Sequence, residues 1–173
     1  MSMKIVLVGY MGSGKSTIGR LLSKKLNIKF IDLDEYIESK LNCNISDLFK
    51  EKGELFFRKM EHKYIQEIMY KKNDFVLSTG GGTPCYSNNL DVIKAETSNV
   101  FYLKVSINGL IERLIIEKEN RPLIKNINNE DLPEFIGKHL FERNIFYMKA
   151  NHIISCDDKS PEVIVDEVFS NLA

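Results

Sequence analysis

A glycine-rich segment directly after a short apolar run constrains this chain more than any other feature. Gly9-Tyr10-Met11-Gly12-Ser13-Gly14-Lys15-Ser16 fits the pattern GxxxxGK[ST] in full, and the apolar run Ile5–Val8 precedes it. The pattern is typical of a phosphate-binding loop (P-loop) between a buried strand and a helix, where glycines let backbone N–H groups approach an anion. We therefore expect a nucleotide-phosphate site here, with positive φ at Gly9, Gly12 and Gly14.

Two side chains of this loop have expected tasks. Lys15 is expected to neutralise the β- and γ-phosphates, and Ser16 to ligate Mg²⁺. The [NT]KxD motif that reads guanine does not follow in the sequence, so ATP is favoured over GTP. The chain is too short for a helicase or a mechanical ATPase.

Length and charge narrow the class of protein. The 173 residues suit one α/β domain or at most a small two-lobed one. The 24 basic and 24 acidic side chains balance, which disfavours a nucleic-acid-coating role. No apolar run approaches the ~20 residues that cross a bilayer, and no cleavable signal is apparent. The widely spaced Cys43, Cys85 and Cys156 indicate reduced thiols and no zinc site, so we expect a cytoplasmic protein.

Apolar runs alternate with helical patterns along the chain. Continuous apolar runs are typical of parallel strands covered on both faces, and strand–helix alternation favours an α/β sheet with right-handed crossovers. The expected strands are Ile5–Val8, Phe30-Ile31, Phe75–Leu77, Val100–Leu103 and His152–Ser155. The expected helices are Lys15–Leu26, Asp34–Leu41, Ile45–Lys52, Glu54–Lys71, Asn88–Glu96, Ser106–Glu117, Leu132–Lys149 and one opened by Ser160-Pro161. The polar stretch Lys118–Asp131 is expected to be a mobile loop.

Acidic and glycine residues follow two of these strands. Asp32 and Asp34 stand two apart at the end of the second strand, so both carboxylates are expected to face the crevice beyond it. One would lie near Mg²⁺ and the other near a hydroxyl group; the alternative is that either aspartate only caps the following helix. Gly80-Gly81-Gly82 follows the third strand and either exposes backbone N–H groups to a ligand or forms a plain flexible turn.

Arginine is rare in this lysine-rich chain, which makes each one informative. Five of the 24 basic residues are arginines. The planar guanidinium grips carboxylates and phosphates with two parallel hydrogen bonds. Glu61, three residues after Arg58, is placed to hold that guanidinium. Three of the set Arg58, Arg113, Arg121 and Arg143 could converge on a small anionic acceptor and on the transferring phosphate.

These residues together resemble the shikimate kinase family over nearly the whole chain. The motifs that carry the resemblance are the P-loop Gly9–Ser16 with Thr17, Phe30-Ile31-Asp32-Leu33-Asp34, Phe57-Arg58 with Glu61, Gly80-Gly81-Gly82, Arg121-Pro122-Leu123, and Arg143 with Tyr147. The P-loop is common to many families, whereas the combination of the other motifs is much more specific. Ile124, where leucine often stands, and Thr83-Pro84-Cys85 depart from the pattern, and no role follows for Cys85.

The resemblance implies a doubly wound α/β fold of the P-loop NTPase class, similar to nucleoside monophosphate kinases, with a five-stranded parallel sheet flanked by helices and a lid loop. It implies transfer of the γ-phosphate of MgATP to the 3-hydroxyl of shikimate, in the chorismate pathway of aromatic amino-acid biosynthesis. We expect a monomer that binds neither nucleic acid nor membrane. One domain is expected over residues 1–173, with the lid at about 113–131 and acceptor-binding helices at about 34–61.

The resemblance also implies residue roles. Arg58 and Arg143 would hold the carboxylate of shikimate, and the backbone of Gly80, Gly81 and Gly82 would line the same pocket. Asp34 would orient or deprotonate the attacking hydroxyl, while Lys15 and Arg121 would stabilise the transferring phosphoryl group. Arg113 would lie against the adenine. The expected ATP-binding set is Gly12, Ser13, Gly14, Lys15, Ser16, Thr17, Arg113 and Arg121, and the expected Mg²⁺ ligands are Ser16 and Asp32.

Two alternatives remain at this point. The first is another small-hydroxyacid kinase, such as a gluconate kinase, which gives no reason for Asp34, Arg58, the triple glycine and Arg143 to occur together. The second is a nucleotide-binding module without catalysis, which acts through a partner. That module would need a broken acceptor pocket, and Asp34, Arg58 and Arg143 are all present.

Overall fold

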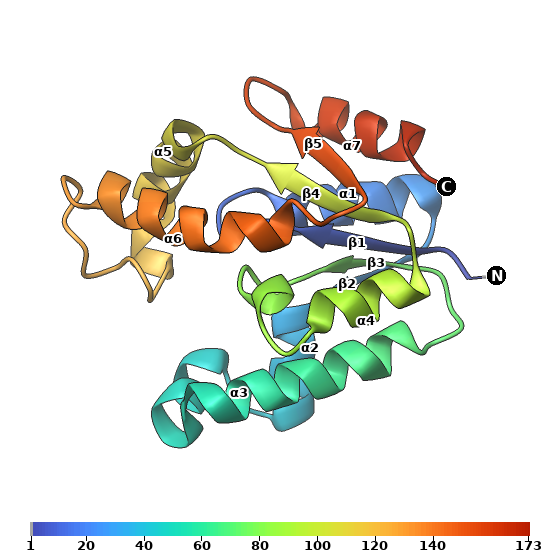
Figure 1. The fold of residues 1–173 in the computed structure, drawn as a ribbon, viewed down its shortest axis with the longest axis horizontal. Helices are drawn as coiled ribbons and strands as arrows, with labels where there is room; N and C mark the ends of the chain where they lie inside the picture. The colour runs from blue at the N-terminus through green and yellow to red at the C-terminus, as the bar shows by residue number, and fades with distance from the viewer. Residues whose placement is uncertain (1) are drawn as a thin grey trace.

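A single parallel sheet organises the computed structural model, which describes residues 2–173. The strand order is β2-β3-β1-β4-β5, and every neighbouring pair is parallel. The strands are β1 (Lys4–Val8), β2 (Lys29–Asp32), β3 (Phe75–Ser78), β4 (Val100–Lys104) and β5 (His152–Ser155). The visible arrows of β1, β3, β4 and β5 point to one side in Figure 1, and β2 is parallel to β3, so the carboxyl ends share one edge of the sheet. The predicted five-stranded parallel sheet is confirmed.

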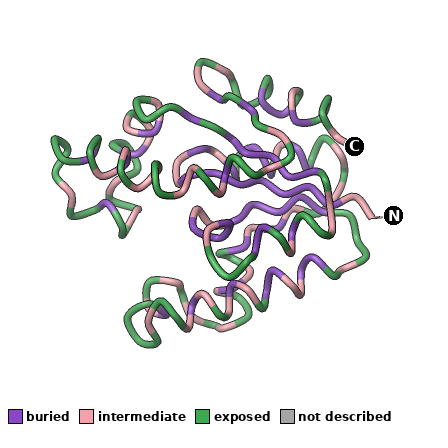
Figure 2. The backbone as a smooth tube through the Cα atoms, viewed as in Figure 1, coloured by how far each residue is buried: buried purple, intermediate pink, exposed green. Residues whose placement is uncertain are grey.

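Burial follows the position of each strand in the sheet. Every residue of the central strands β1 and β3 is buried, whereas the edge strands β2 and β5 each have only one buried residue (Figure 2). This difference arises because a central parallel strand is covered by helices on both faces and by strands on both sides. The continuous apolar runs of the sequence therefore correspond to the centre of the sheet.

The helices cover both faces of this sheet. α4 and α6 lie in front of it in Figure 1, while α1 lies behind and packs against α7. The α-helices are α1 (Lys15–Leu26), α2 (Leu33–Leu41), α3 (Ile45–Met69), α4 (Asn89–Glu96), α5 (Ile107–Glu117), α6 (Leu132–Tyr147) and α7 (Pro161–Ser170). Two short 3-10 helices, η1 (Thr83–Cys85) and η2 (Lys118–Asn120), lie between them. No helix within residues 2–173 has the length and hydropathy needed to cross a membrane.

α3 joins the two helices expected on either side of Gly53. The residue has φ 80° and ψ 171°, which is not helical, so the element is kinked there. Glycine tolerates this conformation because it has no Cβ. The predicted interruption is confirmed, but the two helices follow each other without a connecting loop.

The segment between α5 and α6 contains η2 and a series of turns. Ile124 in this segment is fully buried, which fastens the middle of the segment to the core. The expected mobility of Lys118–Asp131 stays a prediction.

Candidate active site

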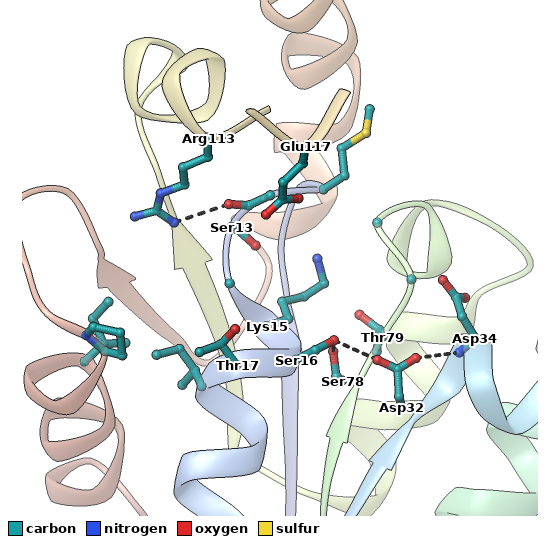
Figure 3. A pocket seen from close by; sticks show the side chains of 18 of the residues that line it. Ser13, Lys15, Ser16, Thr17, Asp32, Asp34, Ser78, Thr79, Arg113 and Glu117 are labelled. Atoms are coloured by element: carbon teal, nitrogen blue, oxygen red, sulfur yellow. Dashed lines mark hydrogen bonds between the residues drawn. The ribbon is translucent and has the colours of Figure 1, made fainter. Parts of the chain in front are cut away.

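A cavity of about 520 Å³ opens at the edge of the sheet where the strands end. Figure 3 shows its side chains converging from the P-loop, from the ends of β2 and β3, and from α5. Its lining includes Met11, Gly12, Ser13, Gly14, Lys15, Ser16, Thr17, Ile18, Asp32, Asp34, Ser78, Thr79, Gly80, Gly81, Arg113, Glu117, Arg121, Lys159, Pro161 and Ile164. Most of the predicted ATP, metal and acceptor residues therefore share one space, while Arg58, Gly82 and Arg143 lie outside this lining.

The P-loop has the backbone shape that its glycines predicted. The φ angles of Gly9, Gly12 and Gly14 are 151°, 78° and 92°. A Cβ on Gly12 would lie 2.9 Å from Leu114, so a larger residue would also collide with α5. Gly14 is the N-cap of α1, which begins at Lys15. The exposed N–H groups of a helix start thus border the cavity, and such groups bind phosphate.

Lys15 lies buried inside its own loop. Its ammonium donates hydrogen bonds to the carbonyl oxygens of Gly9 and Tyr10 at 2.7 and 2.9 Å. Burial lowers the pKa of Lys15 to about 8, and the carboxylate of Asp34 opposes this shift. The positive charge is therefore poorly solvated, which favours an incoming phosphate as its partner.

Ser16, Asp32 and Ser78 bring three side-chain oxygens together beside the P-loop (Figure 3). The Ser16 hydroxyl donates to Oδ2 of Asp32 at 2.7 Å, and its Oγ lies 3.4 Å from the Oγ of Ser78. The parallel register explains the cluster, because Asp32 pairs with Ser78 and Ser78 pairs with Leu7, one residue before the end of β1. Hard oxygen donors of this kind suit Mg²⁺.

Asp32 and Asp34 reach the cavity by different routes. Asp32 ends β2 and caps α2, where its Oδ1 accepts from the backbone N–H groups of Asp34 and Glu35 at 3.0 and 3.3 Å. Asp34 lies in the first turn of α2. The expectation that both side chains point the same way along a strand was therefore wrong, because the helix begins at Leu33. The capping alternative holds for Asp32, and both residues still line the cavity.

Asp34 carries an unusual carboxyl group. Its surroundings raise its pKa to about 6, chiefly through desolvation and then through the nearby carboxylates of Asp32 and Glu61. Lys15 acts in the opposite direction. The side chain still faces the open cleft, where solvent can reach it. A carboxylate with this pKa is ionised at neutral pH and can accept a hydrogen bond or a proton from a hydroxyl group.

The triple glycine is where the acceptor residues meet. A Cβ on Gly80 would lie 3.1 Å from Oδ1 of Asp34, and one on Gly82 would lie 2.8 Å from Nη2 of Arg58. None of the three glycines has a positive φ. A side chain at any of these three positions would press against one of the predicted acceptor residues, which favours glycine here.

Gly81 lies beside Arg143, the second arginine that is predicted to hold the carboxylate of the acceptor. A Cβ on Gly81 would lie 3.2 Å from Nη1 of Arg143, and the Tyr147 hydroxyl donates to the Gly81 carbonyl at 2.6 Å. Arg143 and Tyr147 both lie on α6, so this hydrogen bond fixes the helix beside the turn. Within residues 2–173 Arg143 has no ion-pair partner, which leaves its charge available to an anion.

Arg58 is held more tightly. Its Nη1 lies 3.0 Å from Oε2 of Glu61, which is almost fully buried, and its Nε lies 3.4 Å from Glu54. The predicted support by Glu61 at i+3 is confirmed. The side chain of Arg58 is 13% exposed, so its guanidinium has a defined orientation next to Gly82.

Two further arginines, Arg113 and Arg121, line the cavity on the side of the P-loop and α5. Arg113 donates to the carbonyl of Gly12 at 3.2 Å, which places its guanidinium on the P-loop (Figure 3). Arg121 donates twice to Oε2 of Glu117, at 3.1 Å from Nε and 2.5 Å from Nη2. Both arginines therefore border the nucleotide end of the cavity, and Arg121 is paired with a carboxylate there.

Comparisons with known proteins agree with this geometry. The family model described as "Shikimate kinase" matches residues 11–173. A shikimate kinase of Flavobacterium psychrophilum is 49% identical, over 98% of each chain. The crystal structure of a Bacteroides thetaiotaomicron shikimate kinase superposes with a TM-score of 0.90 at 35% identity, over 97% of each chain. An Acinetobacter baumannii shikimate kinase, solved in complex with shikimate, gives a TM-score of 0.86 at 30% identity, over 98% of this chain and 92% of that chain.

The chain belongs to the shikimate kinase family. Membership makes it an ATP-dependent kinase, so the predicted enzyme class and the predicted function of shikimate kinase are confirmed. A gluconokinase of Sinorhizobium meliloti is 15% identical with a TM-score of 0.59, over 97% of this chain and 90% of that chain, which shows a shared fold alone. The gluconate kinase alternative and the non-catalytic alternative are not supported.

Sequence reasoning missed one side of this kinase's nucleotide cavity. Lys159, Pro161 and Ile164 line it from the loop after β5 and the start of α7. Lys159 pairs there with Glu167 at 2.7 Å. In the sequence, Ser160-Pro161 predicts only the start of a helix. The signal was present, because ligands of parallel α/β sheets bind beyond the carboxyl ends of the strands, and β5 ends at Ser155.

Proposed function

We propose that this shikimate kinase places the carboxylate of shikimate between Arg58 and Arg143 and its 3-hydroxyl beside Asp34. The observation that carries the proposal is the triple glycine, because a Cβ on each of its three residues would lie 2.8 to 3.2 Å from one of these side chains. A ligand at this turn would therefore meet two cations and one carboxylate at once. The complex of the Acinetobacter baumannii relative with shikimate supports the choice of acceptor.

On the donor side, the backbone of Gly12–Thr17 and the side chain of Lys15 bind the phosphates of ATP. Arg113 lies against the adenine and holds the P-loop by its bond to Gly12. Arg121 leaves Glu117 and moves onto the transferring phosphoryl group when the lid, residues 113–131, closes. Phosphoryl transfer depends on positioning and charge neutralisation, and closure excludes the water that would hydrolyse ATP.

Ser16 and Asp32 are the residues that would hold Mg²⁺. Their oxygens lie 2.7 Å apart, and within residues 2–173 no three acidic, histidine or cysteine side chains are arranged so that they could hold a metal ion by themselves. A site with few protein ligands fits Mg²⁺, which keeps waters and binds the substrate phosphates. When bound, the ion would neutralise charge on the β- and γ-phosphates.

Asp34 accepts a hydrogen bond from the attacking hydroxyl, which it orients or deprotonates. Its raised pKa of about 6 supports this task, because a proton acceptor works best when its pKa approaches the working pH. Selectivity follows from Arg58 and Arg143. An acceptor without a carboxylate would leave the guanidinium of Arg143 without an ionic partner in the closed site, which is costly.

All the residues proposed to bind ATP and shikimate come from one chain, which supports a single domain over residues 1–173 that acts as a monomer. In this domain the acceptor-binding helices span residues 34–61. The free thiols of Cys43, Cys85 and Cys156 support a cytoplasmic location. Sedimentation of the purified chain tests the monomer.

A crystal soaked with shikimate and ADP tests the site directly. The carboxylate is expected between Arg58 and Arg143, with the 3-hydroxyl within hydrogen-bond distance of Asp34. A carboxylate elsewhere in the cleft would refute the proposed roles. Coupled ADP release with shikimate and gluconate provides the matching solution test, and equal turnover of gluconate would contradict the selectivity argument.

A further inference from the structure

The segment that follows the triple glycine has no part in the roles proposed so far. It runs through η1 (Thr83–Cys85) to Asn89, the first residue of α4. It approaches Arg58 at two points, although Arg58 precedes it by more than 20 residues on a different helix. Both contacts concern the orientation of the guanidinium.

Tyr86 makes the first contact. The guanidinium carbon of Arg58 lies 3.9 Å from the centroid of the Tyr86 ring. The ring therefore covers one face of the guanidinium, and Gly82 lies so near that a Cβ on it would be 2.8 Å from Nη2. A cation over an aromatic face is attracted by the ring quadrupole, and the contact is stronger where water is excluded. Arg58 is 13% exposed, which meets that condition.

Thr83 makes the second contact through Glu61. The Thr83 hydroxyl donates to Oε1 of Glu61 at 2.7 Å, and the other oxygen of this carboxylate accepts from Arg58 at 3.0 Å. Thr83 and Glu61 are both buried. A buried carboxylate with a partner on each oxygen keeps one orientation, because rotation would leave a polar atom unpaired. Thr83 thus sets the direction in which Glu61 holds Arg58.

Asn89 anchors the segment itself. Its fully buried side chain donates to the carbonyl of Thr83 at 3.0 Å, and its Oδ1 lies 2.7 Å from Nδ1 of His62. His62 follows Glu61 on α3, so the start of α4 is tied to the helix that carries Arg58. This hydrogen-bonded chain gives Thr83 a defined position.

We propose that Thr83 and Tyr86 are positioning residues for Arg58, which hold its guanidinium in the orientation that receives the carboxylate of the acceptor. The inference rests on the proposed role of Arg58. An arginine side chain has many rotamers, and fixing one before the substrate arrives reduces the entropy lost on binding. Loss of either residue should therefore weaken the binding of shikimate and leave the binding of ATP unaffected.

Steady-state kinetics of Tyr86→Leu test the first contact. The KM for shikimate is expected to rise roughly 3- to 30-fold, which is the range of a partly buried cation–π contact, with kcat and the KM for ATP little changed. Tyr86→Phe keeps the aromatic face and should behave as the wild type. Tyr70→Leu, at a 64% exposed tyrosine after α3, is the matched control and should have no effect. An unchanged shikimate KM in Tyr86→Leu, or an equal rise in both KM values, would overturn the proposal.

A second pair of variants covers the possibility that Tyr86→Leu folds poorly. Thr83→Val removes the hydroxyl at nearly constant shape and should raise the shikimate KM, whereas Thr83→Ser should restore it. Thermal melting accompanies each variant. A loss that serine does not rescue, or one shared by both substrates, would mean that Thr83 has only a structural role.

A double-mutant cycle with Arg58→Met shows whether Tyr86 acts through Arg58. Tyr86→Leu should lower kcat/KM for shikimate in the wild type but not in the Arg58→Met background. Equal effects in both backgrounds would overturn the inference, because Tyr86 would then act independently of Arg58. If Arg58→Met alone left the shikimate KM unchanged, the proposed role of Arg58 would fail instead. If Arg58→Met raised the shikimate KM clearly and Tyr86→Leu did not change it, the positioning role of Tyr86 would be refuted, whereas the proposed role of Arg58 would stand.

Discussion

The hydroxyl of Ser16 donates a hydrogen bond of 2.7 Å to Oδ2 of Asp32 and so joins the P-loop to the end of β2. The other oxygen of Asp32 caps α2. One carboxylate thus serves the proposed metal site and the start of a helix. The two tasks can be separated, because asparagine caps a helix about as well as aspartate but carries no charge.

Asp32→Asn is therefore expected to keep the stability of the wild type and to require more Mg²⁺ for half-maximal activity. Asp32→Ala should show the same metal defect and also lose about 1 kcal/mol of stability with its cap. Mg²⁺ titrations of activity at fixed ATP, together with thermal melting, measure the two effects. An unchanged Mg²⁺ requirement in both variants would exclude Asp32 from the metal site.

Arg58→Lys should weaken the binding of shikimate strongly and leave the affinity for ATP nearly unchanged. Lysine keeps the charge but loses the planar fork, and its ammonium cannot bridge Glu61 and a carboxylate in the same geometry. We expect the shikimate KM to rise on the order of 10- to 100-fold, as for a lost charge-assisted hydrogen bond. Equal loss for both substrates would indicate that Arg58 has a structural role only.

Asp34→Asn should remove most turnover while it spares the fold and ATP binding. The amide keeps the size of the side chain but cannot accept a proton. Single-turnover measurements with saturating ATP and shikimate report the chemical step directly. Turnover close to that of the wild type would rule out the proposed role of Asp34.

The pH dependence of kcat/KM for shikimate should reflect the pKa of the Asp34 carboxyl group. With a pKa near 6 in the free enzyme, kcat/KM for shikimate is expected to fall as the pH drops through about 6. Ionisation of Asp34 lowers the stability of the fold, whereas ionisation of a salt-bridged carboxylate raises it. The folded state holds this proton more readily than the unfolded chain, so ionisation destabilises the fold as pH rises from about 4 to about 6. Asp34→Asn should therefore melt slightly higher than the wild type at pH 7, and a lower melting temperature would contradict the shift.

ATP binding should take up a proton at pH 8. The pKa of Lys15 is lowered to about 8 by burial, and a phosphate beside its ammonium would raise it again. Calorimetric titrations in two buffers of different ionisation enthalpy measure this uptake, which should shrink at pH 7 where Lys15 is already charged. Identical enthalpies in both buffers at pH 8 would show that Lys15 does not change its protonation state.

Gly82→Ala should raise the shikimate KM with little change in stability. The backbone of Gly82, at φ −86° and ψ −14°, suits any residue, but the new methyl group would displace Arg58, which lies 2.8 Å from its position. Gly53→Ala is the matched control. Nothing lies within 4 Å of that position, but its backbone conformation, φ 80° and ψ 171°, is adopted almost only by glycine, so the variant should lose about 1–3 kcal/mol of stability without a change in KM. The reverse pattern would refute the close-approach argument.

Local sequence patterns were sufficient to predict much of the structure of this protein. The P-loop, its glycines and the start of α1 at Lys15 follow from spacing alone, because a strand–loop–helix unit depends on neighbouring residues. The continuous apolar runs predicted the parallel sheet, since covered strands bury both faces. The set of motifs also pointed to the correct family, and Lys118–Asp131 as a mobile loop stays a prediction.

Only the tertiary structure decided how the acceptor side is built. Arg58 and Arg143 approach the triple glycine from two different helices, Lys159 lines the cavity from the loop after β5, and the ring of Tyr86 lies against the guanidinium of Arg58. These relationships join residues on different elements, and their distances are set by strand register and helix packing. Sequence spacing carries no information about such distances, because side chains far apart along the chain become neighbours only when the sheet and its helices have packed.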